Sequence, residues 1–361
     1  MKILILTNSD VGLYQFRREL ISALSLAHHE ITIALPNGSM IPSLEQMGCH
    51  FVPISLDRRG INPARDLSLF IQYLSLLRRE SPDLVITYTI KPNIYGGIAC
   101  RLTRIPYAAN ITGLGTAFQK KGLLRSLVST MYRIALRRAK VIFFENKENE
   151  SVFLEQRLIC ATQSVVLHGA GVNLTHFSPT AYPSSNTVTR FLFIGRLMRE
   201  KGVDELFSSM ERLWREGFSC CLDIVGDCEE DYTHKIQTYV QQGWLFYHGF
   251  QNDVRPFIAA SHCFVLPSWH EGMANTNLEC AAMCRPLITS RIHGCMEAVE
   301  EGKSGLLCEP QNAQSLYLAM RTFCKIPPQR REAMGLAGRA HMEKYFDKRQ
   351  VVAATIKALG I

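Results

Sequence analysis

The chain has 361 residues, of which 47% are hydrophobic and 20% are charged, so it is long enough for two globular domains. No apolar run is long enough to span a bilayer, and the apolar N-terminal segment 1–7 is too short for a secretory signal, so a cytoplasmic location is expected. The 12 cysteines are scattered without zinc-ligand spacing, and we interpret them as reduced core residues, with no metal site predicted.

The positive charge is uneven along the chain. Residues 1–175 contain 20 Lys and Arg against 12 Asp and Glu, whereas residues 176–361 contain 20 of each sign. A basic N-terminal half is typical of proteins that meet a phosphorylated substrate, an anionic lipid surface or nucleic acid. Nucleic acid is the weakest of these, because the basic segments lack interleaved aromatics and any recognised binding motif.

The N-terminal half alternates apolar strands with amphipathic helices. This alternation predicts a parallel sheet with crossover helices. Helices are expected at Tyr14–Leu26 and Asp66–Glu80, and strands at Lys2–Thr7, Glu30–Ala34, Phe51–Ile54, Leu84–Tyr88, Tyr107–Asn110, Val141–Phe144 and Ser164–Leu167.

Polar loops follow three of these strands. Because parallel strands end at the same edge of a sheet, we expect these loops to line one cleft. Gly12 would let backbone N–H groups approach a phosphate. The candidate acceptor-binding residues in these loops are Tyr14, Arg17, Lys91, Asn110, Thr112 and Gly113.

The segment Phe118–Lys140 contains no acidic residue, and its apolar residues recur at helical spacing. A basic amphipathic helix of this kind is typical of membrane-surface binding. The alternative is a crossover helix with its apolar stripe on the sheet, and both interpretations can hold at once. The expected membrane-facing residues are Lys120, Lys121, Arg125, Arg137 and Arg138.

A segment rich in Pro, Ser and Thr at 176–188 predicts an interdomain linker. The strand pattern then restarts near Phe191, Leu222, Leu245, Cys263, Leu287 and Gly305. The fold class predicted is therefore α/β, with two Rossmann-like domains facing a central cleft: residues 1–175, the linker 176–188, and residues 189–345. Residues 346–361 form the last helix.

Two motifs in the second domain carry the chemistry. In the first, the strand at Phe191–Ile194 ends at Gly195, and Arg196 and Lys201 follow, placed to converge on a diphosphate.

In the second motif, Glu271 lies in the loop after the strand Cys263–Leu266, and Glu279 lies on the helix expected from Asn275 onward. The N-terminus of that helix suits a phosphate, while two carboxylates suit hydroxyl groups, and a nucleotide sugar carries both. A Glu pair at this spacing is common, so the pair by itself favours two solvated surface residues.

The combination of both motifs resembles the retaining glycosyltransferases of family GT4, which have the two-domain GT-B fold. Further matches are Ile224–Asp227, His248–Phe250, Val265–Ser268 and Glu309–Pro310. The segments 89–97 and 112–116 resemble a subgroup that adds a sugar to undecaprenyl-diphosphate-linked saccharides. That subgroup includes the bacillosaminyl-acceptor N-acetylgalactosaminyltransferases and the O-antigen or capsule assembly enzymes.

The resemblance implies a UDP-sugar as donor, with GalNAc, Gal or GlcNAc as leading sugars, and a lipid-linked diphosphate saccharide as acceptor at the anionic inner membrane surface. It implies that residues 346–361 cross back onto the N-terminal domain, and that no metal or other cofactor is needed. The catalytic residues would be Arg196, Lys201 and Glu271. The donor-binding residues would be Gly12, Arg196, Lys201, Gly226, Phe250, Glu271, Gly272, Met273, Ala274, Asn275 and Glu279.

One position departs from the family pattern. Many members carry a histidine in the loop that reads Asn110–Gly113 here, and Asn110 or Thr112 is the expected substitute. The same residues allow three other functions. Glycoside hydrolysis by the two carboxylates is rejected because the strand–turn–helix contexts favour phosphate binding. A synthase acting on a soluble acceptor and a non-catalytic nucleotide-binding scaffold remain open.

Overall fold

A computed structural model describes residues 1–361 except 58, 59, 61, 115–121 and 185–187. The chain forms two compact units, the first from Met1–Ala170 with Arg349–Ile361 and the second from Gly171–Lys348. The boundary at 170 lies a few residues before the predicted one at 175. All 12 cysteines are free thiols. Within the described residues, no helix is both long and apolar enough to cross a membrane.

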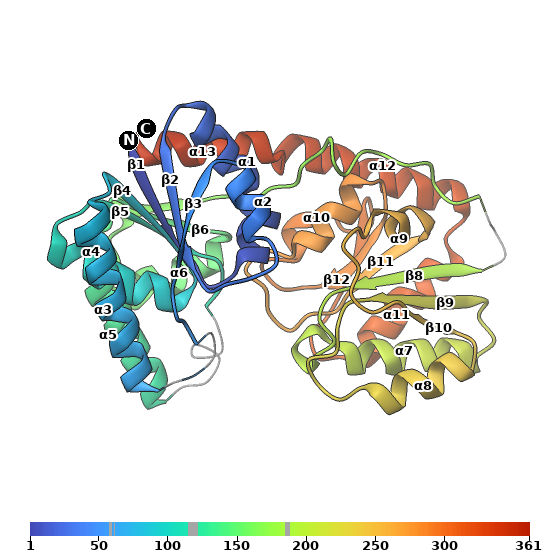
Figure 1. The fold of residues 1–361 in the computed structure, drawn as a ribbon. Helices are drawn as coiled ribbons and strands as arrows, with labels where there is room; N and C mark the ends of the chain where they lie inside the picture. Colours follow the sequence, from blue (N-terminus) through green and yellow to red (C-terminus); the bar gives the residue numbers. More distant parts are fainter. Residues whose placement is uncertain (58–59, 61, 115–121, 185–187) are drawn as a thin grey trace. The chain divides into compact units, whose positions relative to one another are not determined.

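Unit 1 is a seven-stranded parallel sheet in the order β3-β2-β1-β4-β5-β6-β7, with helices on its faces (Figure 1). All seven strands expected in this half are present. Its elements are β1 (Lys2–Leu6), α1 (Asp10–Leu26), β2 (Glu30–Leu35), α2 (Ile41–Gln46), β3 (Cys49–Pro53), α3 (Pro63–Glu80), β4 (Leu84–Tyr88), η1 (Pro92–Gly96), α4 (Gly97–Thr103), β5 (Tyr107–Ile111), α5 (Leu123–Leu136), β6 (Val141–Phe144), α6 (Lys147–Glu155), η3 (Ala161–Gln163) and β7 (Ser164–Val166).

The core of unit 1 lies on both faces of this sheet, as expected for a parallel sheet covered by crossover helices. Strands β1, β4 and β5 are almost entirely buried, which explains their near-continuous runs of apolar residues. The C-terminal helix α13 (Lys348–Leu359) adds Val351 and Leu359 to the core cluster that contains Ile3 and Leu20. Its end is held by Lys140, whose Nζ donates to the carbonyl of Leu359 at 2.6 Å.

Unit 2 is a six-stranded parallel sheet in the order β10-β9-β8-β11-β12-β13 (Figure 1). The order reverses direction between β8 and β11, so the crevice between the loops that follow these two strands is the expected ligand position. Its elements are β8 (Thr189–Ile194), η4 (Arg199–Lys201), α7 (Val203–Arg215), β9 (Cys220–Val225), α8 (Thr233–Gln241), β10 (Leu245–Tyr247), α9 (Arg255–Ala260), β11 (Cys263–Leu266), α10 (Asn275–Ala282), β12 (Leu287–Ser290), η5 (Met296–Ala298), β13 (Gly305–Cys308), α11 (Ala313–Lys325) and α12 (Pro328–Tyr345).

The segment predicted as a linker packs against unit 2 in its described part. Arg285 is fully buried, so its guanidinium donors need acceptors inside the protein. Nη2 of Arg285 donates to Oγ1 of Thr180 at 2.9 Å and to the carbonyl of Ala181 at 2.8 Å. The Tyr182 hydroxyl donates to the carbonyl of His262 at 2.9 Å. Residues 180–182 therefore belong to the wall of unit 2.

Candidate active site

The structure brings Lys201 and Glu271 together at the point where the strand order of unit 2 reverses. Nζ of Lys201 lies 2.5 Å from Oε1 of Glu271. The hydroxyl of Ser268 donates to the same oxygen at 2.8 Å. The Lys201 side chain is 22% exposed and that of Glu271 is 13% exposed, whereas Ser268 is fully buried. A cation and a carboxylate, both largely buried, are thus held together beside a buried hydroxyl group.

The backbones of the two loops touch, which explains why Gly202 follows Lys201. Gly202 has φ +71°, and a Cβ atom there would lie 2.1 Å from the carbonyl oxygen of Pro267. The N–H of Trp269 donates to the carbonyl of Glu200 at 2.9 Å. Only glycine allows this approach, so the loop after β8 is locked onto the loop after β11.

The predicted helix after Gly272 is α10, which begins at Asn275. Met273 and Ala274 are buried ahead of it, and the N–H of Ala274 donates to the carbonyl of Gly294 at 2.7 Å. Glu279 is half-buried on this helix, and Asn275 and Gly272 are half-buried at its start. The second carboxylate therefore lies on the element that follows Glu271, as the sequence predicted.

Arg196 also follows β8, but its side chain is directed toward β9 rather than toward β11. Its Nη1 pairs with Oε1 of Glu229 at 2.6 Å, and its side chain is 52% exposed. The N–H of the next residue, Leu197, donates to the carbonyl of Asp227 in the loop after β9. Convergence of Arg196 and Lys201 on one diphosphate therefore stays a prediction, since in this structure Arg196 is paired toward β9 and Lys201 toward β11.

Gly226 holds three loop backbones together beside this site. It has φ +140°, and a Cβ atom there would lie 2.0 Å from the carbonyl oxygen of Gly195. Its N–H donates to the carbonyl of Gly249 at 2.8 Å. Phe250, which follows Gly249, is 55% exposed. This exposure is unusual, because Phe is most often buried.

In unit 1, α1 begins at Asp10, so the predicted residues Gly12 and Tyr14 lie in the first turns of this helix and make local contacts there. The N–H of Gly12 donates to Oγ of Ser9, which caps α1, at 3.1 Å. In this conformation the Gly12 N–H serves the helix cap rather than a phosphate. Tyr14 is half-buried, with the guanidinium of Arg18 5.7 Å from its ring centre.

Arg17 faces the sheet rather than solvent. Its Nη2 pairs with Oε1 of Glu145 at 2.8 Å, and both side chains are 11% exposed. Its guanidinium also lies 5.0 Å from the ring centre of Tyr88. The pKa of Tyr88 is raised, mainly by burial, while the nearby Arg17 opposes that rise.

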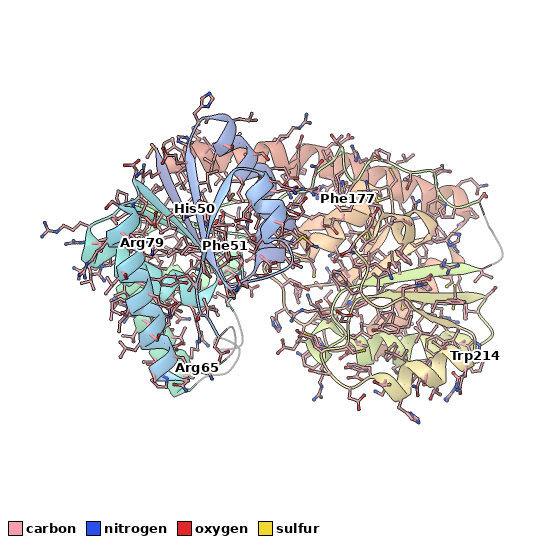
Figure 2. The ribbon with its side chains drawn as sticks, in the orientation of Figure 1. His50, Phe51, Arg65, Arg79, Phe177 and Trp214 are labelled. Atoms are coloured by element: carbon pink, nitrogen blue, oxygen red, sulfur yellow. The ribbon has the colours of Figure 1, made fainter. Side chains whose placement is uncertain are left out.

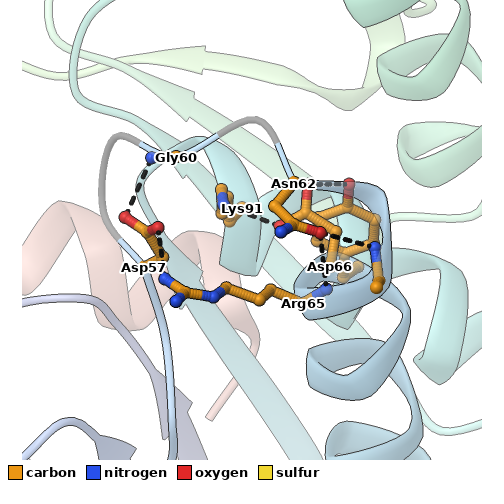
Figure 3. Close-up of polar contacts among 8 residues, drawn as sticks. Asp57, Gly60, Asn62, Arg65, Asp66 and Lys91 are labelled. Atoms are coloured by element: carbon orange, nitrogen blue, oxygen red, sulfur yellow. Dashed lines mark hydrogen bonds and ion pairs between the residues drawn. The ribbon is translucent and has the colours of Figure 1, made fainter.

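Lys91 is also ion-paired. Its Nζ lies 2.6 Å from Oδ1 of Asp66, and the hydroxyl of Tyr95 donates to Oδ2 of the same carboxylate at 2.9 Å (Figure 3). Asp66 lies in the first turn of α3. The described contacts of Lys91 therefore hold the start of that helix, beside the pair formed by Asp57 and Arg65.

Asn110 is a buried residue of β5, only 4% exposed. Its Nδ2 donates to the carbonyl of Thr87 at 3.2 Å, and its own carbonyl accepts from Asn93 at 2.8 Å. These hydrogen bonds connect β4, β5 and η1, so Asn110 stabilises this part of the unit 1 sheet. Thr112 and Gly113 follow the strand and are half-buried.

The predicted membrane-facing helix is present as α5, which is shorter than the segment Phe118–Lys140. Arg137 and Arg138 are exposed at its C-terminal end, and Arg125 is half-buried in its first turn. Lys120 and Lys121 lie outside the described residues.

Several partners of the predicted side chains are not among the residues predicted from the sequence. They are Ser268 and, for the three cations Arg17, Lys91 and Arg196, the carboxylates Glu145, Asp66 and Glu229. Ser268 carried a signal, since it stands three residues before Glu271 in the turn after a buried strand. The carboxylates carried none, because each lies far from its cation in sequence.

Comparison with known proteins follows the division into two units. A family model described as "Glycosyl transferase 4-like" matches residues 2–146, and one described as "Glycosyl transferases group 1" matches residues 188–325. Between them the two models match most of both units, and the chain belongs to the glycosyltransferases that they describe. The predicted enzyme class is thus confirmed.

Two curated relatives cover most of the chain. A Campylobacter jejuni N,N'-diacetylbacillosaminyl-diphospho-undecaprenol alpha-1,3-N-acetylgalactosaminyltransferase is 26% identical over 88% of this chain and 87% of its own length. An Escherichia coli UDP-Gal:alpha-D-GlcNAc-diphosphoundecaprenol alpha-1,3-galactosyltransferase is 28% identical over 73% of this chain and 71% of its own.

The fold has solved counterparts. The crystal structure of Anabaena Alr3699/HepE in complex with UDP aligns with a TM-score of 0.81 over all of both chains at 19% identity. The prediction of a GT-B glycosyltransferase built from two Rossmann-like domains is confirmed.

Proposed function

We propose that this glycosyltransferase moves a sugar from a UDP-sugar to an undecaprenyl-diphosphate-linked saccharide in bacterial surface polysaccharide assembly. The observation that carries the proposal is the contact between Lys201 and Glu271 at the strand-order reversal of unit 2. The two relatives named above act on diphospho-undecaprenol-linked saccharides, and HepE binds UDP in its crystal. The donor sugars we expect are GalNAc, Gal and GlcNAc.

In this proposal Lys201 stabilises the leaving group. As the bond between the anomeric carbon and the β-phosphate oxygen breaks, negative charge grows on that phosphate, and a fixed ammonium lowers the energy of the charged transition state. The N-terminus of α10 and Arg196 supply further positive potential once the diphosphate is bound. With these groups present, no metal ion is required.

Glu271 holds the donor sugar. Both described hydrogen bonds of its carboxylate go to Oε1, from Lys201 and Ser268, which leaves Oε2 to accept a sugar hydroxyl. In this proposal Glu279, on the helix that follows, accepts hydrogen bonds from the ribose hydroxyls. The exposed ring of Phe250 offers an apolar face to the nucleotide.

The reaction proceeds with retention of configuration. The acceptor hydroxyl oxygen forms its bond to the anomeric carbon on the face that UDP leaves, and its proton passes to an oxygen of the departing β-phosphate. The products are UDP and the extended lipid-linked saccharide, so atoms and charge balance without a protein nucleophile.

We further propose that unit 1 binds the cytoplasmic face of the inner membrane through α5. Leu124, Leu127 and Ile134 of this helix are 48%, 58% and 47% exposed, and Arg137 and Arg138 lie exposed at its end. Exposed apolar residues flanked by arginines suit an anionic lipid surface.

The test is a panel of UDP-sugars incubated with a synthetic polyprenyl-diphosphate-linked N-acetylhexosamine. The proposal predicts UDP release that depends on the acceptor, and a product whose new linkage has the anomeric configuration of the donor. Release of UDP that is equal with and without acceptor, or no release from any donor, would contradict it. Efficient transfer to a soluble sugar without lipid diphosphate would favour a soluble-acceptor synthase instead.

A further inference from the structure

Unit 1 contains a cavity of about 820 Å³ at an edge of its sheet that none of the predicted site residues line. It lies between the carboxyl ends of β2 and β3 and the first turns of α3. Its volume is within the range of small-molecule sites. Its polar lining residues are Asn37, Ser55, Asp57, Arg65, Ser68 and Gln72.

One wall of the cavity is a polar stripe of α3. Arg65, Ser68 and Gln72 share one face of this helix because they follow helical spacing. The amide of Gln72 joins the two walls: its Oε1 accepts from the Ser55 N–H at 3.2 Å, and its Nε2 donates to Oγ of Ser68 at 3.3 Å. A ligand hydroxyl group can replace either bond, since it both donates and accepts.

The two charged residues among the described lining residues are paired with each other. Nη1 of Arg65 lies 3.1 Å from Oδ2 of Asp57, and Oδ1 of Asp57 accepts from the Gly60 N–H at 2.9 Å (Figure 3). Among the described lining residues there is one cation and one carboxylate. A neutral polyhydroxyl compound would find both a donor fork and an acceptor in this pair.

Apolar surface completes the lining and continues outside it. Pro36, Pro53 and Leu56 offer flat patches to the C–H faces of a sugar ring. On the neighbouring face of α3, Leu67 and Ile71 are 59% and 56% exposed, one helical turn apart. Figure 2 shows Arg65 at one end of α3 and Arg79 at the other. Because Arg65 lines the cavity, the cavity lies at the Arg65 end of this helix.

Given the proposed function, we propose that this cavity binds the neutral saccharide of the lipid-linked acceptor, with its apolar chain beside Leu67 and Ile71. A ligand with hydroxyl groups at one end and hydrocarbon at the other matches the polar stripe and the apolar pair on adjacent faces of one helix. Asp66, bonded to Lys91 and Tyr95, holds the helix turn that carries Arg65.

The test fills the cavity with Ser68→Trp, and removes the bridging amide with Gln72→Ala. Ser75→Trp is the matched control, because Ser75 is exposed on the same helix two turns further along and does not line the cavity. Steady-state transfer is measured with one donor and two acceptors that carry the same N-acetylhexosaminyl diphosphate, one on a polyprenyl chain and one on a short alkyl chain. UDP affinity is measured by calorimetry as a check on folding.

Both cavity variants are expected to raise the KM for both acceptors at least tenfold, with UDP affinity within twofold of the parent and Ser75→Trp like the parent. Leu67→Ser with Ile71→Ser is expected to raise the KM of the polyprenyl acceptor alone. Parent-like acceptor KM values in Ser68→Trp would overturn the saccharide assignment. Inhibition by sugar-free polyprenyl diphosphate is measured as well. If Ser68→Trp weakens this inhibition as much as it raises the acceptor KM, the cavity would bind the lipid diphosphate, and the saccharide assignment would be overturned. A parent protein inactive on both acceptors would instead contradict the proposed function itself.

Discussion

The ammonium of Lys201 lies 2.5 Å from the Glu271 carboxylate, and this contact joins the loops that follow β8 and β11. Both side chains are largely buried, so each is held in position before any ligand arrives. A diphosphate brings more negative charge than one carboxylate, so Lys201 can bind it while remaining close to Glu271. We therefore expect separate roles for the two residues: Lys201 binds the diphosphate, and Glu271 binds the donor sugar.

Lys201→Ala is expected to weaken UDP binding at least about tenfold, since a fixed point charge at a diphosphate contributes roughly 1.4 kcal/mol or more. Isothermal titration with UDP measures this. Lys235→Ala is the control. Lys235 is an exposed residue of α8 that pairs with Asp204 of α7, so this variant should leave the UDP affinity unchanged. Equal UDP affinities in parent and Lys201→Ala would remove Lys201 from the donor site.

Ser268 is expected to act as a positioning residue, through its hydrogen bond to Oε1 of Glu271. Ser268→Ala should lower kcat about tenfold with little change in the KM for the donor, since the carboxylate stays but its orientation loosens. Ser268→Thr retains the hydroxyl and should restore most of kcat. If Ser268→Thr is as impaired as Ser268→Ala while both fold normally, the hydroxyl is not the cause.

Gly226→Ala is expected to destabilise unit 2 by about 2–4 kcal/mol, because its Cβ would clash with the Gly195 carbonyl and its φ is unfavourable for a side chain. Gly243→Ala separates the two causes: Gly243 also has positive φ, but open space surrounds it, so only about 1 kcal/mol is expected. Urea unfolding gives both free energies. Similar values for the two variants would show that the contact with Gly195 has no effect.

Arg137→Glu with Arg138→Glu is expected to reduce binding to anionic liposomes at least about tenfold, since each basic residue near such a surface contributes about 1 kcal/mol. Lys325→Glu with Arg330→Glu makes the same change in net charge on exposed residues of unit 2 and should bind like the parent. Co-sedimentation with vesicles measures the bound fraction. An equal loss in both double variants would indicate a net-charge effect rather than a surface on α5.

The thiols are expected to fall into two reactivity classes. Burial raises the pKa of Cys49 and of Cys221 to about 11, so at pH 8 only about one thousandth of each is thiolate. Cys160 and Cys228 are exposed. Alkylation of the native protein followed by peptide mass analysis should therefore modify Cys160 and Cys228 first, with Cys49 and Cys221 modified only after denaturation. Early modification of Cys221 would contradict its burial.

The strands of both sheets could be predicted from the sequence because both faces of a parallel sheet are covered, which leaves continuous apolar runs such as Cys263–Leu266. The same property hid the contacts of Asn110. In a strand buried on both faces, no alternation shows which way a polar residue points. The structure shows hydrogen bonds between Asn110 and both Thr87 and Asn93, and its contact with the acceptor stays a prediction.

From the sequence, the positions of the candidate site residues after buried strands could be predicted, but only some of their side-chain pairs could. Lys201 and Glu271 were identified because each follows a buried strand, and the strand order then brings them together. Arg196 follows the same strand as Lys201, yet it pairs with Glu229. Side-chain direction within a loop depends on contacts far away in sequence, which spacing alone does not contain.

The most direct test of the account is sugar transfer by Glu271→Gln, which keeps the shape of the side chain and removes its charge. We measure transfer of labelled sugar from the UDP-sugar to the polyprenyl-diphosphate-linked acceptor, with UDP affinity determined on the same samples. We expect Glu271→Gln to bind UDP within about threefold of the parent affinity and to transfer sugar about 100-fold more slowly, equivalent to about 2.7 kcal/mol in the barrier. Transfer at the parent rate with UDP bound would contradict the assignment of this carboxylate to the donor sugar.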